Sequence, residues 1–74
     1  MQASAGITLN ITVNGRPWRV RAGADLAELV RELGLPEASV AVERNHAVVR
    51  RRDHAATALA EGDEIEVVTL VGGG

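Results

Sequence analysis

The sequence predicts a small α+β domain in which one helix covers one face of a single mixed β-sheet. Three observations carry this prediction. Alternating apolar residues end at Asn14-Gly15, a pair typical of a tight hairpin turn. An amphipathic helical stripe runs from Leu26 to Leu33, and a long alternating strand lies close to the C-terminus. At 74 residues the chain has room for one domain.

Residues 7–13 and 16–21 are predicted to form the hairpin. In the first strand every second residue is apolar, the period of a half-buried strand: Ile7, Leu9, Ile11, Val13. Asn14 and Gly15 both tolerate the positive φ of a type I′ turn. In the return strand Trp18 and Val20 share a face, and Pro17, which cannot donate to a ladder, indicates an edge. Residues 1–6 are small and polar, and we expect a disordered leader there.

The helix has recognisable signals at both ends. Asp25 followed three residues later by Glu28 matches the reciprocal pattern of a capping box. One apolar stripe follows, at positions i, i+3, i+4 and i+7: Leu26, Leu29, Val30, Leu33. Gly34 is suited to a left-handed C-terminal cap and Pro36 prevents continuation, so a helix of two to three turns is predicted.

The second half of the chain predicts three more strands. Short strands are expected at residues 40–43 and 48–49, with a turn at 44–46 and with Val40 and Val42 on one face. Residues 50–62 predict an irregular crossover with one helical turn, anchored by Leu59. The last strand is predicted at residues 64–71, and its inward residues would be Ile65, Val67 and Val71.

The resulting order is ββαββ, with too few strands for a sandwich and one helix to cover one face. A right-handed crossover would place the last strand in the centre, parallel to the first. This is the β-grasp, or ubiquitin-like, fold, predicted here for residues 7–71. A split β-α-β arrangement is the alternative, but it would need a second helix that the sequence does not show.

Composition excludes several classes of protein. The chain has no cysteine, which excludes a disulfide framework and a cysteine nucleophile. Its net charge is −2, and with Trp18 as its one aromatic residue the chain has no set of aromatics interleaved with its eight arginines, so a nucleic-acid-binding role is not expected. There is no apolar run long enough for a membrane span and no secretion signal, so we expect a cytoplasmic protein without membrane contact.

No catalytic or metal-binding constellation stands out. His46 and His54 each lie beside arginine in a loop, without an evident orienting carboxylate, and both are expected to be exposed. Four acidic residues near the C-terminus lack calcium-loop spacing and are expected on a solvated turn and strand face: Glu61, Asp63, Glu64, Glu66. Arg50-Arg51-Arg52 predicts a solvated turn, with a partner or phosphate contact as the alternative.

The C-terminus is the most distinctive feature. Gly72, Gly73 and Gly74 directly follow the last predicted strand and are expected to form a flexible tail. Without Cβ atoms such a tail can enter a channel too narrow for other residues. The terminal carbonyl is also left uncrowded, so a nucleophile can reach it once the carboxylate is activated.

These features together resemble the ThiS family, the sulfur carrier proteins of thiamine biosynthesis. The resemblance runs from Ile7 to Gly74 and rests on six segments: Asn14-Gly15, residues 25–29 (Asp-Leu-Ala-Glu-Leu), residues 40–45 (Val-Ala-Val-Glu-Arg-Asn), Val48-Val49, Leu59 with Gly62-Asp63, and residues 71–74 (Val-Gly-Gly-Gly). In one departure, Arg50 stands where the family usually has proline after the paired valines.

The resemblance implies a protein co-substrate rather than an enzyme. An adenylyltransferase related to ubiquitin-activating enzymes would use ATP to adenylate the Gly74 carboxylate. A persulfide fed by cysteine desulfurase would then convert it to a thiocarboxylate, which thiazole synthase would use as sulfur source. Gly72 and Gly73 would thread the partner's channel, and the chain itself would bind no cofactor or metal.

Val68 and Leu70 are predicted to form the partner docking patch, because they share the sheet face that the helix does not cover. Rim candidates are Arg50, Arg51, Arg52, Glu64 and Glu66. Three other functions stay open. They are a molybdopterin synthase small-subunit type of carrier, a ubiquitin-like protein modifier, and a bare interaction module. Residues 69–71 (Thr-Leu-Val) do not match the Pro-Pro-Val-like approach of the first, and the chain has no lysine for self-linked chains of the second.

Overall fold

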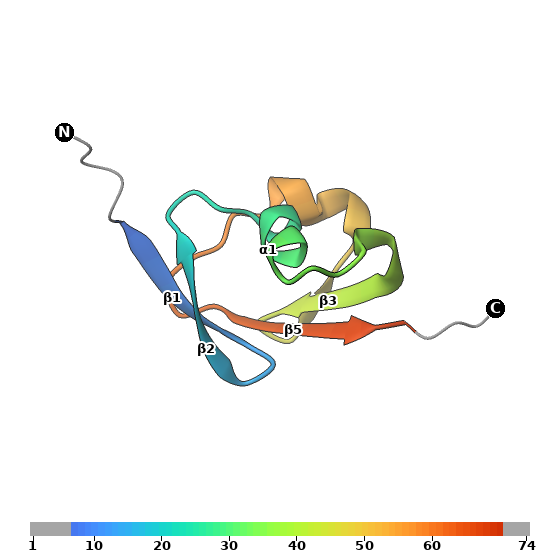
Figure 1. Cartoon of the computed structure of the whole chain (residues 1–74), viewed down its shortest axis with the longest axis horizontal. Helices are drawn as coiled ribbons and strands as arrows, with labels where there is room; N and C mark the ends of the chain where they lie inside the picture. Colours follow the sequence, from blue (N-terminus) through green and yellow to red (C-terminus); the bar gives the residue numbers. More distant parts are fainter. Residues whose placement is uncertain (1–6, 71–74) are drawn as a thin grey trace.

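The computed structural model describes residues 7–70. Its elements are β1 (Thr8–Val13), β2 (Arg16–Arg21), α1 (Leu26–Glu32), the 3-10 turn η2 (Glu37–Ser39), β3 (Val40–Arg44), β4 (Ala47–Val49), the 3-10 helix η3 (Arg51–Ala56) and β5 (Glu64–Thr69) (Figure 1). The sheet order is β2-β1-β5-β3-β4, with β1 parallel to β5 and the other neighbours antiparallel. The predicted β-grasp fold is therefore confirmed, with the last strand in the centre.

The core lies between α1 and one face of the sheet. The predicted helical stripe is buried at Leu26, Leu29 and Val30, whereas Leu33 is half-buried at the helix end. The inward residues of the sheet contribute the rest of the core, including Ile11, Val13, Val20, Val40, Val42, Ile65 and Val67. Because one helix covers one face only, the opposite face of the sheet is open.

The hairpin turn adopts the predicted geometry, with φ of 51° at Asn14 and 81° at Gly15. The Asn14 side chain also reaches the central strand, where it accepts from the Val67 N–H at 2.8 Å and donates to the Val67 carbonyl at 3.2 Å. Pro17 lies in β2, which is an edge strand, as its missing N–H predicts.

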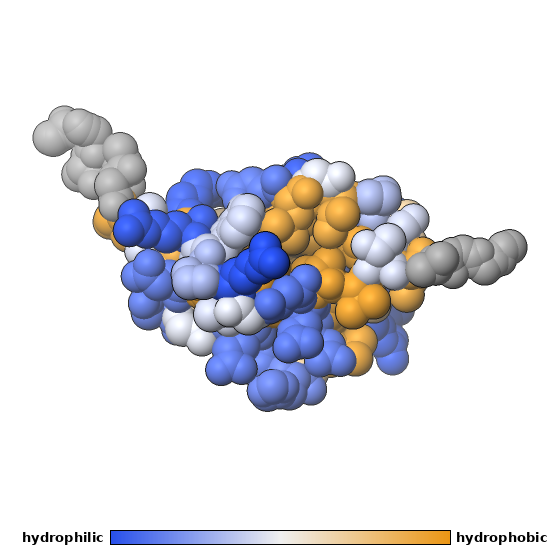
Figure 2. All heavy atoms as spheres, turned by 60° about the horizontal axis from the view of Figure 1, so that its bottom comes forward, coloured by the Kyte–Doolittle hydropathy of each residue, from blue (hydrophilic) through white to orange (hydrophobic). Residues whose placement is uncertain are grey.

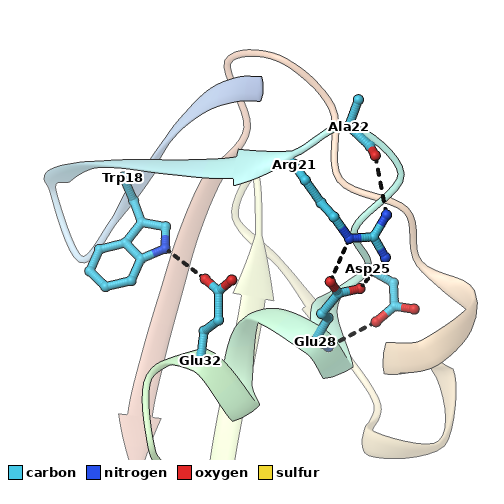
Figure 3. Close-up of polar contacts among 6 residues, drawn as sticks. All are labelled: Trp18, Arg21, Ala22, Asp25, Glu28 and Glu32. Atoms are coloured by element: carbon cyan, nitrogen blue, oxygen red, sulfur yellow. Dashed lines mark hydrogen bonds and ion pairs between the residues drawn. The ribbon is translucent and has the colours of Figure 1, made fainter. Parts of the chain in front are cut away.

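The first turn of α1 differs in one detail from the predicted capping box. The Asp25 carboxylate accepts from the Glu28 N–H at 2.8 Å, but the Glu28 carboxylate binds Arg21 of β2 through two hydrogen bonds (Figure 3). Trp18 adds a hydrogen bond from β2 to Glu32 (Figure 3). Side chains of β2 thus join the hairpin to the helix. Of the two hydrogen bonds that a capping box predicts, the one accepted by Asp25 is formed, whereas Glu28 binds Arg21 instead.

α1 ends at Glu32 with Leu33 as its C-cap, and Gly34 follows in the predicted left-handed conformation with a φ of 76°. The Gly34 N–H donates to the Arg31 carbonyl and the Leu35 N–H donates to the Val30 carbonyl. These two bonds form a Schellman motif, which satisfies carbonyls that the helix leaves free.

The second half of the chain is more ordered than the sequence predicts. The crossover contains η3, a six-residue 3-10 helix, where one helical turn was expected. The β3–β4 turn is formed by Asn45 and His46, both with positive φ. The last strand ends at Thr69, so Leu70 follows it. The predicted leader at residues 1–6, the inward position of Val71 and the tail at 72–74 lie outside the described residues.

Two expectations about polar residues are wrong. His54 was expected in solvent but is 1% exposed, because η3 turns its ring inward between Glu37 Oε2 at 3.1 Å and the Val49 carbonyl at 3.2 Å. Asp63 was expected on a solvated turn but is also buried, since donors from Arg44, Asn45 and Ala60 surround its carboxylate. His46 is exposed as predicted.

Candidate functional site

The open face of the sheet carries an apolar patch near the end of β5. Val68 is 59% exposed and Leu70 is 55% exposed, so both predicted patch residues are available to a partner. Ala41 of β3 pairs with Val68, and Val48 of β4, which is also exposed, points to the same face by strand alternation. Figure 2 shows apolar surface gathered toward the C-terminal end on this side of the molecule.

Acidic residues occupy the same face nearer the start of β5. Glu64 and Glu66 are exposed on β5, and Glu66 pairs directly with Glu43 of β3. Two carboxylates opposite each other on a sheet are mutually destabilising. The open face is therefore apolar toward the end of β5 and acidic toward its beginning.

The last described residue is held to the body of the domain. The Leu70 N–H donates to the Ser39 carbonyl at 2.7 Å, one step beyond the pairing of Thr69 with Val40. The residue that follows β5 is thus fixed to η2 and β3 through its backbone. Sequence reasoning missed Ser39, because it acts through its carbonyl and no side-chain pattern reveals it.

Ala41 was missed as a member of the patch, and Val48 was missed as a further exposed apolar residue of the same face, level with Glu43 and Glu66. Both could have been found by alternation, since Val40 and Val42 point inward and the residue between them must point outward. Val48 likewise precedes the half-buried Val49.

Asp63 anchors the start of β5, and its carboxylate accepts hydrogen bonds from neighbouring parts of the fold. Arg44 Nε lies 2.9 Å from Asp63 Oδ2, Asn45 donates to Oδ1 at 3.1 Å, and the Ala60 N–H donates at 2.8 Å. Burial acts to raise the pKa of Asp63, but these hydrogen bonds and the Arg44 charge outweigh it, so its pKa lies below the ordinary value. Both carboxylate oxygens of Asp63 are engaged by these donors, so the carboxylate is used in holding the turn.

The described residues offer no metal centre: between Ile7 and Leu70 no group of three or more His, Cys, Asp or Glu side chains could hold an ion. In the same stretch no helix is long and apolar enough to cross a membrane. Both ring nitrogens of His54 already have hydrogen-bond partners in the core, so neither is available to hold a metal ion.

The three successive arginines are exposed as predicted and line an open hollow together with Glu37. The hollow has a volume of about 490 Å³.

The fold defines a small ubiquitin-like domain, with an exposed apolar patch beside the end of β5. The ThiS family model matches residues 11–74, and the chain belongs to the ThiS family of ubiquitin-like sulfur carriers. Members of this kind are small non-catalytic proteins.

Solved structures agree with this assignment. The crystal structure of the thiamine biosynthesis protein ThiS from Geobacter metallireducens is 36% identical, with a TM-score of 0.75, and covers 89% of this chain and 100% of that chain. An NMR structure of a thiamine biosynthesis protein from the same organism has a TM-score of 0.72 at 36% identity, covering 89% and 88%. A designed protein based on human erythrocytic ubiquitin, 19% identical with a TM-score of 0.53, shares the fold alone.

Two similar curated proteins are named thiazole synthase. The one from Magnetococcus marinus is 47% identical over 66 residues, and the one from Paramagnetospirillum magneticum is 35% identical over 66 residues. These matches cover 89% of this chain but 20% of each relative, so the chain spans about a fifth of their length. An uncharacterized protein of Porphyra purpurea, ycf40, is 29% identical and is matched over 93% of its length.

Proposed function

We propose that this chain is the sulfur carrier of thiamine biosynthesis and that its reactive group is the Gly74 carboxylate. The observation that carries the proposal is the ThiS family match, which extends from residue 11 through Gly74. The likeness to ThiS of Geobacter metallireducens supports the pathway. Support for thiazole synthase as partner comes from the two proteins of that name that contain a segment similar to this chain.

The proposed chemistry begins with attack of a Gly74 carboxylate oxygen on the α-phosphorus of ATP, which releases pyrophosphate. A persulfide sulfur, derived through cysteine desulfurase, then attacks the carbonyl carbon, and AMP leaves. Cleavage of the resulting S–S bond by a thiol leaves a thiocarboxylate on Gly74. Thiazole synthase receives that sulfur.

In this proposal the chain contributes binding rather than acid, base or metal. Gly72 and Gly73 thread the channel of the adenylyltransferase because they lack side chains. Val68 and Leu70 dock on the partner beside the channel, as their exposure on the uncovered face favours. ATP and the persulfide are bound by the partner enzymes.

The test is the intact mass of the purified chain after incubation with the adenylyltransferase, ATP and a persulfide source. The expected result is replacement of one oxygen by sulfur on Gly74, dependent on ATP. A variant that lacks Gly74 serves as the matched control and should not change in mass.

Transfer of the sulfur to thiazole synthase then separates thiamine synthesis from a molybdopterin-type role. If the mass of the full chain never changes, while the same enzyme converts its own carrier, the thiocarboxylate proposal is wrong. Recovery of the chain joined to lysines of other proteins would instead support a protein modifier.

A further inference from the structure

Arg50, Arg51 and Arg52 form a region of excess positive charge, in which three arginines outnumber the adjacent Asp53 and Glu37. The arginines that form ion pairs in the described part of the chain are Arg21 and Arg44, so the three successive guanidinium groups have no ion-pair partner among residues 7–70. They line an open hollow of about 490 Å³, and the acidic residue of that hollow is Glu37.

Glu37 does not cancel their charge, because it is one carboxylate among three guanidinium groups and it is engaged by the core. Its Oε2 lies 3.1 Å from His54 Nδ1, while His54 Nε2 lies 3.2 Å from the Val49 carbonyl oxygen. The hollow therefore keeps an excess of positive charge.

The register of the sheet places this hollow beside the end of β5. β4 and β5 are both antiparallel to β3, so they run in the same direction, and Val49 and Val67 lie level because both pair with Val42. Arg50 therefore follows β4 at the end of the sheet where Leu70 follows β5. Two strand spacings separate β4 from β5, which is about 10 Å.

A second connection runs through η2. Glu37 lines the hollow, and Ser39, two residues later, accepts the hydrogen bond from Leu70. Figure 1 shows η2 and the end of β5 on the same side of the molecule.

We propose that Arg50, Arg51 and Arg52 bind acidic side chains of the adenylyltransferase, on the surface that borders its channel for the glycine tail. This inference rests on the proposed function. In the proposed function the reacting atom belongs to Gly74, four residues after Leu70. Four residues can span at most about 14 Å when fully extended. An enzyme that reaches that atom must approach the domain closely at this end, where the arginines lie.

Side-chain directions favour a protein surface over a single phosphate. Arg51 and Arg52 begin η3, in which successive residues are turned by about 120°, and Arg50 precedes it in an extended conformation. The three side chains therefore leave the backbone in different directions around a wide, open hollow, which is not the arrangement of a pocket for one small anion. Several carboxylates spread over a partner surface match this arrangement, and guanidinium binds carboxylate through paired hydrogen bonds.

The experiment compares two triple variants that each remove three positive charges. The first is Arg50→Gln with Arg51→Gln and Arg52→Gln. The control is Arg16→Gln with Arg19→Gln and Arg31→Gln, whose exposed side chains form no ion pair among the described residues. The dissociation constant of each full chain for the adenylyltransferase is measured by calorimetry over a series of salt concentrations, after circular dichroism has established that both variants are folded.

We expect the first variant to bind at least about 10-fold more weakly at low salt, with a smaller dependence on salt, and the control to stay within about 2-fold of wild type. Equal affinity and equal salt dependence for the two variants would overturn the proposal. Saturable binding of ATP to the chain alone, lost in the first variant only, would also overturn it and assign the site to phosphate. If the competent enzyme neither binds nor adenylates the wild-type chain, the proposed function itself is wrong and the arginine proposal falls with it.

Discussion

The backbone N–H of Leu70 donates to the Ser39 carbonyl at 2.7 Å, which ties the residue after β5 to η2. The Leu70 side chain is nevertheless 55% exposed. Its backbone is therefore fixed while its side chain is exposed, the combination expected of a residue that contacts a partner. This relationship makes Leu70 the sharpest test of the docking patch.

We expect Leu70→Glu to reduce adenylation at least about 10-fold, because a charge would be placed where a partner buries an apolar side chain. The free energy of unfolding should change by less than about 0.5 kcal/mol, since the side chain is exposed. The measurements are the rate of ATP-dependent pyrophosphate exchange and a urea unfolding curve.

Val48→Glu is the matched control for this variant. Val48 is 72% exposed and faces the same side, but it lies on the edge strand β4, two strands from β5. A smaller effect than that of Leu70→Glu is expected. Wild-type exchange rates for Leu70→Glu would remove Leu70 from the docking surface.

Asn14 is expected to stabilise the fold by two separable effects. Asn14→Gly keeps the positive φ of the turn but loses both hydrogen bonds to Val67, which should cost about 1–2 kcal/mol. Asn14→Ala loses the same bonds and adds left-handed strain, so its cost should be about 1 kcal/mol larger. Urea unfolding measures both, and equal costs for the two variants would show that the turn relaxes.

Asp63 should make the domain sensitive to acid. The pKa of Asp63 in the folded chain lies below its unfolded value of about 3.9. The contribution of the ionised carboxylate to the free energy of unfolding is therefore complete above that value, and it is lost as the pH falls through the folded pKa. We expect Asp63→Asn to lower the free energy of unfolding by about 2 kcal/mol at neutral pH. The difference in unfolding free energy between wild type and variant should become smaller below about pH 4. A gap that is constant down to about pH 2.5 would show that Asp63 does not titrate differently on folding.

The elements that could be predicted are those whose conformation is determined by the pattern of their own residues. Alternation located β1 and β2, Asn14-Gly15 located the turn between them, and Gly34 located the end of α1. The crossover was underestimated because a 3-10 helix has little sequence signature beyond the absence of strand alternation.

The polar interior could not be predicted because burial of a polar residue depends on partners distant in sequence. His54 meets Glu37 of η2, and Asp63 meets Arg44 of β3, 19 residues earlier. At the candidate site, the exposed positions of Val68 and Leu70 followed from alternation. The Ser39 contact and the position of the arginine hollow required the register of β3 with β4 and β5.

His54 is expected to support the end of β5 through η2. His54→Leu would fill the buried site with an apolar side chain but leave the Val49 carbonyl and Glu37 without their partner. The free energy of unfolding should fall by about 2 kcal/mol. Since η2 also holds Leu70 through Ser39, the Leu70 amide should exchange with solvent faster than the loss of global stability alone explains. Val20→Ala is the control, because it removes about the same stability from the buried face of β2, away from η2. Amide exchange followed by NMR compares the two variants, and an equal increase at Leu70 in both would mean that η2 and the end of β5 are held independently of His54.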